Sequence, residues 1–152
     1  MTNQQISSLL ESQRQFYRSG RTLSVKFRIE SLKALYTCVK RYETEINAAL
    51  KADLGKSAFE SFMCESGFAL SEIGYMIKNT KSFSNPKKVR TPLAQFPSKS
   101  FKQSVPYGNV LIMSPWNYPF LLTVTPLANA IAAGNTAIVK PSAYSPETSK
   151  IL

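Results

Sequence analysis

The chain of 152 residues contains no histidine and two cysteines. Because no histidine is available to activate a thiol, Cys38 and Cys64 are interpreted as packing residues on predicted helices. A metal site is not expected, since neither histidine nor a cysteine cluster is present. Two cysteines do not form a disulfide framework and fit a reducing compartment, and no apolar run follows Met1 that would indicate a signal peptide. These absences predict a cytoplasmic protein.

Charge is also missing locally, because the segment 103–139 holds no Asp, Glu, Lys or Arg. Pro115, Pro119 and Pro126 divide this segment, and no uninterrupted apolar stretch approaches the ~20 residues that a membrane-spanning helix needs. The segment is therefore predicted to be a buried strand–helix–strand unit, with no membrane contact. Its polar amides include Asn117, Asn129 and Asn135, whose retention in such a context suggests a purpose.

Positive charge is in excess, with a formal net charge of +10. The basic residues are dense between two apolar regions, at Lys78, Lys81, Lys87, Lys88, Arg90, Lys99 and Lys102. Nucleic-acid binding would require a recognisable module or aromatic residues spaced for base stacking, and neither is found. Charge alone is a weak signal, so we favour a solvated or inter-domain face and expect no nucleic-acid partner.

The first part of the chain is predicted to be helical. Apolar residues at helical spacing predict one helix over about 6–17, a second beginning at Ser24 and a third over about 42–52. Ser57 and Glu60 form a capping-box pair, which begins a continuous helical face of about 25 residues that ends at Asn85–Pro86. Two glycines on this helix, Gly67 and Gly74, either allow close contact with a neighbour or merely weaken the helix.

The second part predicts alternating strands and helices. A proline-rich connector over 91–97 leads to an extended segment over 99–105 and a turn at 106–109. Short apolar strands are predicted at 110–113 and 136–139, joined by a helix over about 119–133, and a last helix begins at Ser145–Pro146. Such a unit forms a right-handed crossover between parallel strands.

Ligands of parallel sheets gather beyond the carboxyl ends of the strands. The first strand runs into Pro115–Trp116–Asn117, and the second ends at Lys140. Both groups are therefore expected at one edge of the sheet, where they predict a single site.

The motifs Ser114–Pro119, Ala132–Asn135 and Lys140–Ser142 resemble the aldehyde dehydrogenase superfamily. The stretch 53–57 narrows the resemblance to the class 3-like branch, and the match runs from about Ser24 to the end. The resemblance implies an α/β fold in which an N-terminal helical layer precedes the first βαβ unit of a Rossmann-like cofactor-binding domain. The expected regions are an N-terminal helical region over 1–90, a connector with an extended strand over 91–109, and the start of the NAD(P)-binding domain over 110–152.

The resemblance also implies residue roles. Asn117 matches the amide that donates to the oxyanion formed when a cysteine thiolate attacks the aldehyde; the alternative is that Asn117 only caps the following turn. Lys140 matches the lysine that binds the adenosine ribose, with a surface lysine as the alternative. The remaining cofactor-binding positions are Met113, Ser114, Pro115, Trp116 and Ser142, although Trp116 could equally be core.

The resemblance implies NAD or NADP as cofactor and an aldehyde as substrate. Many NAD-preferring members carry a Glu three residues after the lysine, where this chain has Ala143. The enzyme is therefore expected to accept NADP as well as NAD. The resemblance also implies a homodimer. The positions that match the family do not include its nucleophilic cysteine, so these residues alone are expected to be inactive, and a truncated nucleotide- or partner-binding module is the alternative.

Overall fold

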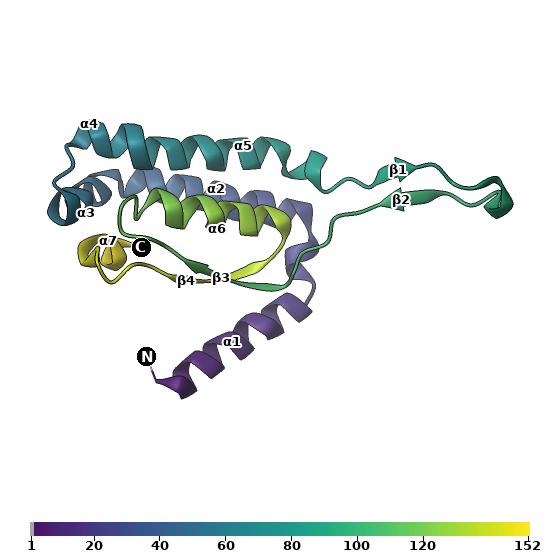
Figure 1. The fold of residues 1–152 in the computed structure, drawn as a ribbon, viewed down its shortest axis with the longest axis horizontal. Helices are drawn as coiled ribbons and strands as arrows, with labels where there is room; N and C mark the ends of the chain where they lie inside the picture. The colour runs from purple at the N-terminus through teal and green to yellow at the C-terminus, as the bar shows by residue number, and fades with distance from the viewer. Residues whose placement is uncertain (1) are drawn as a thin grey trace.

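The computed structural model describes residues 2–152 and consists of a helical layer, a parallel two-stranded sheet and a projecting hairpin (Figure 1). The helices before the hairpin are α1 (Asn3–Arg18), α2 (Val25–Arg41), α3 (Glu43–Leu54), α4 (Ala58–Ser61) and α5 (Gly67–Phe83), with a 3-10 turn at Arg21–Leu23 and a π-helical turn at Phe62–Ser66. The elements after it are β3 (Asn109–Met113), α6 (Leu121–Ala133), β4 (Thr136–Lys140) and α7 (Pro146–Ile151).

The first three helices begin and end close to where the sequence predicts. Ser24 is the N-cap of α2, and its hydroxyl accepts a hydrogen bond from the amide of Phe27 at 3.3 Å. Gly20 and Gly55 follow α1 and α3 with φ of 74° and 69°, which is the left-handed conformation that suits glycine. Within residues 2–152, every helix is too short or too polar to cross a lipid bilayer.

The long helix that begins at Ser57 is not regular. The Ser57 hydroxyl accepts from the amide of Glu60 as the capping pair predicts, but a π-helical turn separates α4 from α5. The wider turn changes which side chains face inward, so Phe59 and Phe62 are exposed while Glu65 is buried. An added Cβ at Gly67 would lie 2.7 Å from the carbonyl oxygen of Phe62, which belongs to the same helical run, so the predicted contact with a neighbouring element is not found there. The same expectation is wrong for Gly74, which has open space around it.

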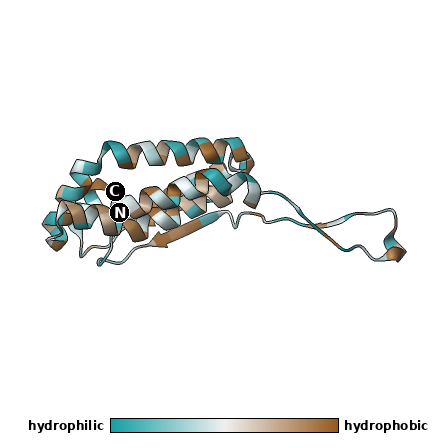
Figure 2. Ribbon diagram, turned by 90° about the horizontal axis from the view of Figure 1, so that it is seen from above, coloured by the Kyte–Doolittle hydropathy of each residue, from teal (hydrophilic) through white to brown (hydrophobic). Residues whose placement is uncertain are grey.

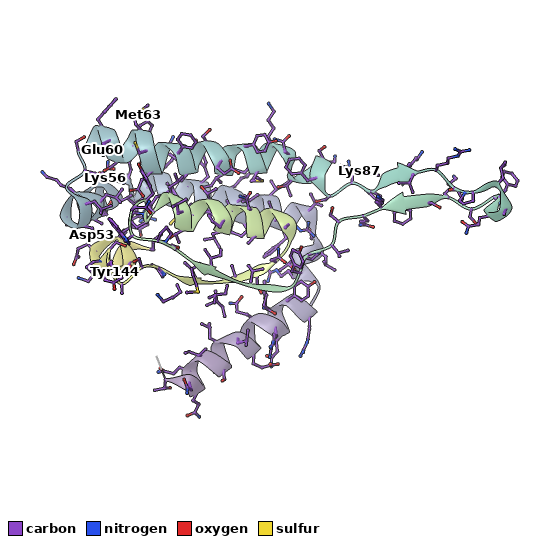
Figure 3. All side chains as sticks on the ribbon, in the orientation of Figure 1. Asp53, Lys56, Glu60, Met63, Lys87 and Tyr144 are labelled. Carbon is purple, nitrogen blue, oxygen red and sulfur yellow. The ribbon has the colours of Figure 1, made fainter. Side chains whose placement is uncertain are left out.

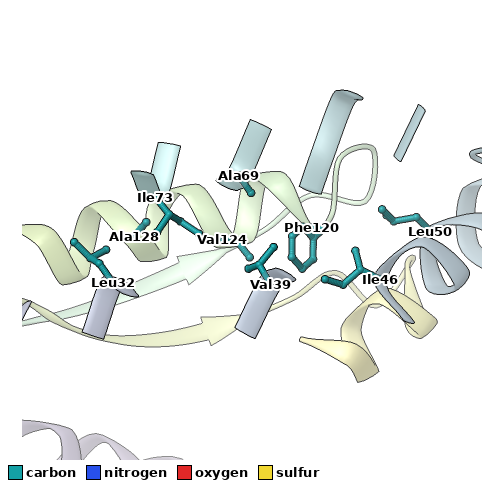
Figure 4. Packing of buried hydrophobic residues seen from close by; sticks show 9 residues of the cluster. All are labelled: Leu32, Val39, Ile46, Leu50, Ala69, Ile73, Phe120, Val124 and Ala128. Atoms are coloured by element: carbon teal, nitrogen blue, oxygen red, sulfur yellow. The ribbon is translucent and has the colours of Figure 1, made fainter. Parts of the chain in front are cut away.

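Strands β3 and β4 are parallel, which confirms the predicted crossover unit. Asn109 pairs with Thr136 at the start of the ladder, and Met113 pairs with Lys140 at its end. Helix α6 connects the two strands and lies between them and the layer of α2 and α5 (Figure 1). The hydrophobic core forms between these helices and α3 (Figure 4), from Leu32, Val39, Ile46, Leu50, Ala69, Ile73, Phe120, Val124 and Ala128.

The connector contains the extended segment predicted over 99–105, but the hairpin that this segment forms was not predicted. Strands β1 (Lys87–Val89) and β2 (Ser100–Lys102) pair as an antiparallel hairpin, with a 3-10 turn at Leu93–Gln95 near its tip. This arm, residues 87–102, extends away from the rest of the molecule (Figures 1 and 2). Two apolar side chains near the tip are almost fully solvent-exposed, Leu93 at 91% and Phe96 at 84%.

The predicted motif 132–135 joins the helical layer to the sheet. Gly134 ends α6 with a φ of 88°, and the amide side chain of Asn135 accepts from the backbone N–H of Gly108 at 2.9 Å. The guanidinium of Arg28 lies against Gly134 and donates to the carbonyl oxygens of Thr22 at 2.6 Å and Leu23 at 3.1 Å, with longer bonds to Ser84 and Ala132. Burial lowers the pKa of Arg28, and Tyr17 opposes that effect.

Candidate active site

The carboxyl ends of β3 and β4 bring the predicted site residues to one edge of the sheet. The backbone N–H of Ser114 donates to the carbonyl oxygen of Lys140 at 3.2 Å, which extends the ladder beyond Met113. Met113, Trp116 and Asn117 are exposed just beyond this edge. The prediction that the two motifs meet at one place is therefore confirmed.

Ser114 is fixed by a hydroxyl from the helix that follows. The Thr123 hydroxyl oxygen lies 2.6 Å from both the Ser114 hydroxyl and the carbonyl oxygen of Pro119. Because a carbonyl oxygen only accepts, Thr123 donates to Pro119, and the Ser114 hydroxyl then donates to Thr123. The side chain of Ser114 is thereby tied to the loop that contains Asn117.

The residues on the second strand differ in how they are held. The Lys140 ammonium is exposed, and its hydrogen bond to the carbonyl oxygen of Pro141 is long, at 3.5 Å. Ser142 is buried, and its hydroxyl accepts from the amide of Tyr144 at 3.2 Å, which shapes the turn before α7. Lys140 is thus available to a ligand, while the Ser142 hydroxyl already has a backbone partner.

Asn117 lies in the loop between β3 and α6 but does not cap the helix. The N-cap position of α6 is Phe120, which makes no side-chain cap bond. The first amides of α6 instead donate to the Glu65 carboxylate, from Phe120 at 2.8 Å and from Leu121 at 3.1 Å. A carboxylate is favourable there because the helix N-terminus carries partial positive charge. The cap at the start of α6 is therefore Glu65.

Glu65 is paired with Lys56, and both are buried, at 0% and 8% exposed. The Lys56 ammonium forms an ion pair with the second oxygen of the Glu65 carboxylate. It also donates to the backbone carbonyl oxygen of Asn117 at 3.2 Å and lies 4.2 Å from the ring centroid of Tyr118. Neither residue was predicted from the sequence to be part of the site.

One signal in the sequence pointed to this pair. Glu65 lies four residues before Ala69 and eight before Ile73, on the buried stripe of its helix, and a buried carboxylate requires a partner. Its partner Lys56 lies nine residues away, beyond a turn and a helix start, and its contact with Asn117 spans 61 residues, so neither link follows a local spacing.

The last helix is also capped from a distant segment. Ser145 occupies the predicted N-cap position of α7, but its side chain makes no cap bond. The Asp53 carboxylate accepts from the amide of Glu147 at 3.1 Å and from the amide and hydroxyl of Thr148 at 2.7 Å. Burial alone would raise the pKa of Asp53, but these hydrogen bonds and nearby Lys150 outweigh it and lower the pKa. Asp53 and Lys56 both lie at the end of the molecule near α7 (Figure 3).

The site has no metal-ligand character in the described part of the chain. Among residues 2–152, no three His, Cys, Asp or Glu side chains gather as a metal site would require. Cys38 is exposed on α2, and Cys64 is partly buried in the π-helical turn. The polar groups at the sheet edge are amide, hydroxyl and ammonium donors, which suit anionic oxygens and ribose hydroxyls.

The family model for the aldehyde dehydrogenase family matches residues 1–152. The chain belongs to the aldehyde dehydrogenase family. It is 44% identical over 137 residues to 4,4'-diaponeurosporen-aldehyde dehydrogenase of Staphylococcus aureus, covering 90% of this chain and 30% of that relative. It is 44% identical over 139 residues to aldehyde dehydrogenase family 3 member A2 of Mus musculus, covering 91% and 29%.

Solved structures of aldehyde dehydrogenases share the fold. The substrate-bound state of Staphylococcus aureus AldH superimposes with a TM-score of 0.93 at 42% identity, covering 96% of this chain and 32% of that one. A Streptococcus pyogenes succinic semialdehyde dehydrogenase in complex with NADP+ has a TM-score of 0.86 at 19% identity. The chain spans about 30% of the length of the curated relatives that it matches.

Proposed function

We propose that this chain supplies the oxyanion donor and part of the cofactor site of an NAD(P)-dependent aldehyde dehydrogenase, which oxidises aldehydes to carboxylic acids. The observation that supports the proposal is the parallel pairing of Met113 with Lys140. This pairing places the residues that resemble the family's oxyanion and ribose positions at one edge of one sheet. The site residues are then Asn117 for catalysis and Met113, Ser114, Pro115, Trp116, Lys140 and Ser142 for the cofactor.

Asn117 would act on the carbonyl oxygen of the aldehyde. When a cysteine thiolate adds to the carbonyl carbon, the C–S bond forms and the oxygen takes up the electron pair of the C=O bond. Asn117 offers a neutral N–H donor whose side chain is exposed at the sheet edge. Stabilising the developing charge by one such donor is worth ~10²–10³ in rate. Neither Cys38 nor Cys64 is proposed as the thiolate.

The cofactor, when bound, supplies a nicotinamide that accepts the hydride. The exposed ammonium of Lys140 would donate to the adenosine ribose, and residues 113–116 would line the cofactor with backbone atoms. Ala143 places no carboxylate near Lys140, so nothing at that position repels a 2′-phosphate. We therefore propose that the enzyme accepts both NAD and NADP.

The test is the variant Asn117→Ala in the complete enzyme that contains these residues. We expect kcat to fall by ~10²–10³, with the dissociation constant of the cofactor unchanged, because the lost donor acts on the oxyanion. Asn79→Ala is the matched control, since Asn79 is exposed on α5 and bonds to Tyr75 of its own helix. An Asn117→Ala enzyme with normal kcat would contradict the oxyanion assignment. Residues 1–152 alone should show no dehydrogenase activity.

We further propose a cytoplasmic homodimer in which the arm contacts a second copy of the chain. An isolated two-stranded hairpin is marginally stable, and Lys87 faces Lys102 across this one. Leu93 and Phe96 expose apolar surface that a partner would cover. Replacing both by Ser should shift the complete enzyme toward monomer in sedimentation analysis, and an unchanged dimer would contradict the role of the arm.

A further inference from the structure

The loop that carries Asn117 is held by two buried charged side chains. Lys56 follows α3, and Glu65 lies in the π-helical turn, so both come from the helical layer and not from the sheet. Within residues 2–152, the hydrogen bonds, the ion pair and the aromatic contact of the two charged groups go either to the other member of the pair or to residues 117–121. The pair thus connects the helical layer to one short segment.

The two side chains hold the loop in its middle and at the end that leads into α6. Lys56 donates to the carbonyl oxygen of Asn117 at 3.2 Å and packs over the ring of Tyr118. Glu65 accepts from the amides of Phe120 and Leu121 at 2.8 and 3.1 Å. The carbonyl contact fixes the peptide plane from which the Asn117 side chain projects, and the amide contacts fix where α6 begins.

A requirement for stability alone does not account for this arrangement. Burying two charges costs solvation, and apolar replacements of buried ion pairs often preserve or increase stability. The best-supported role of a buried ion pair is to select one conformation of the surrounding chain among several. Here the selected geometry is that of the loop, and displacing a catalytic donor by 1 Å can cost about 10² in rate.

We propose that Lys56 and Glu65 are positioning residues that hold the segment 117–120, so that the Asn117 amide is presented to the oxyanion. This role rests on the proposed function of Asn117. It predicts that loss of either charge lowers kcat without weakening cofactor binding, because Lys140 and residues 113–114 are held by the β3–β4 ladder instead.

The test uses Lys56→Met and Glu65→Gln in the complete enzyme. We expect kcat to fall by about 10- to 100-fold in each, with the cofactor dissociation constant and the KM for aldehyde within about twofold of wild type. Thr80→Ala is the control for general destabilisation. Thr80 is fully buried on α5 and its hydroxyl bonds to Met76 of the same helix, so this variant should lower the thermal midpoint while leaving kcat within about twofold.

A double-mutant cycle separates positioning from an independent effect. If Lys56 acts through Asn117, then Lys56→Met should change kcat by no more than about threefold in an Asn117→Ala background. Full multiplication of the two effects would overturn the proposal. Glu65→Gln keeps the volume of the side chain and one acceptor oxygen. If Lys56→Met does not fold, the kcat of Glu65→Gln therefore tests the positioning role.

The outcomes also separate this inference from the proposed function. Loss of kcat in Asn117→Ala together with normal kcat in Lys56→Met and Glu65→Gln would overturn the positioning role and leave the oxyanion role standing. Normal kcat in Asn117→Ala would overturn the oxyanion role, and the positioning role with it.

Discussion

Adding a single methyl group at Gly134 should lower the free energy of unfolding strongly. The φ of this residue is 88°, and a Cβ added there would lie 2.6, 2.7 and 2.8 Å from the Nη2, Cζ and Nε atoms of Arg28. The guanidinium has little freedom to retreat, because it is buried and hydrogen-bonded to the carbonyl oxygens of Thr22, Leu23 and Ala132 and to the Ser84 hydroxyl. Gly134→Ala must therefore strain the backbone and displace Arg28.

The magnitude follows from these two effects. A left-handed conformation costs a non-glycine residue about 1–2 kcal/mol. Displacing Arg28 loses at least one charge-assisted hydrogen bond, at about 1.5–3 kcal/mol each. We expect Gly134→Ala to lower the free energy of unfolding by about 3–5 kcal/mol, which is at the upper end for a point mutation. Urea unfolding followed by helical circular dichroism measures the change.

Gly20 and Gly55 supply matched controls. Both have positive φ, at 74° and 69°, and an added Cβ would meet nothing within 4 Å. Gly20→Ala and Gly55→Ala should therefore cost only the strain of about 1–2 kcal/mol. In an Arg28→Ala background, Gly134→Ala should fall to the same value. If Gly134→Ala costs no more than Gly20→Ala in the wild-type chain, then the contact with Arg28 does not constrain Gly134 and the reasoning is refuted.

Two further variants test other contacts. Asp53→Asn removes the charge that caps α7 and should cost about 1 kcal/mol at neutral pH. Because folding lowers the pKa of Asp53, its contribution to the free energy of unfolding is present above the ordinary pKa of 3.8 and is lost as pH falls through the lower folded pKa. The stabilities of wild type and Asp53→Asn should therefore converge in acid. A stability difference that is constant with pH would contradict the lowered pKa. Ala143→Glu should raise the KM for NADP by about tenfold, with little effect on NAD, because a carboxylate beside Lys140 repels the 2′-phosphate. Strict use of NAD by the wild-type enzyme in steady-state kinetics would refute the premise.

Local sequence patterns were sufficient to predict the main helices, the paired strands β3 and β4, and the sheet edge at which the site lies. Ser24 and Ser57 cap helices because their hydroxyls bond residues three positions ahead, and such signals are visible in a few residues. The apolar runs at 110–113 and 136–139 predicted the paired strands for the same reason. The division of the chain at residues 90 and 109 stays a prediction.

The features that sequence patterns missed depend on distant pairs. The carboxylate that caps α6 comes from Glu65, and the one that caps α7 comes from Asp53, 94 residues away in sequence. Neither helix is capped by the side chain at its own N-cap position. The preference for serine at that position therefore predicted Ser145 as the cap of α7 and missed Asp53. The arm was missed because its strands are only three residues long and mostly exposed, which leaves no apolar alternation to detect.

Charged side chains of the helical layer contact the backbone of the segment 103–139, which has none of its own. Arg28 binds the carbonyl oxygen of Ala132 near the end of α6, Lys56 binds that of Asn117, and Glu65 binds the amides at the start of α6. These contacts give partners to the amides of Phe120 and Leu121 and to the carbonyl oxygen of Ala132, in a segment that has no charged side chain of its own. The helical layer therefore contributes to fixing both ends of α6, together with Gly134 at its C-terminal end. Because the loop with Asn117 leads directly into α6, that layer also determines where Asn117 lies relative to Lys140.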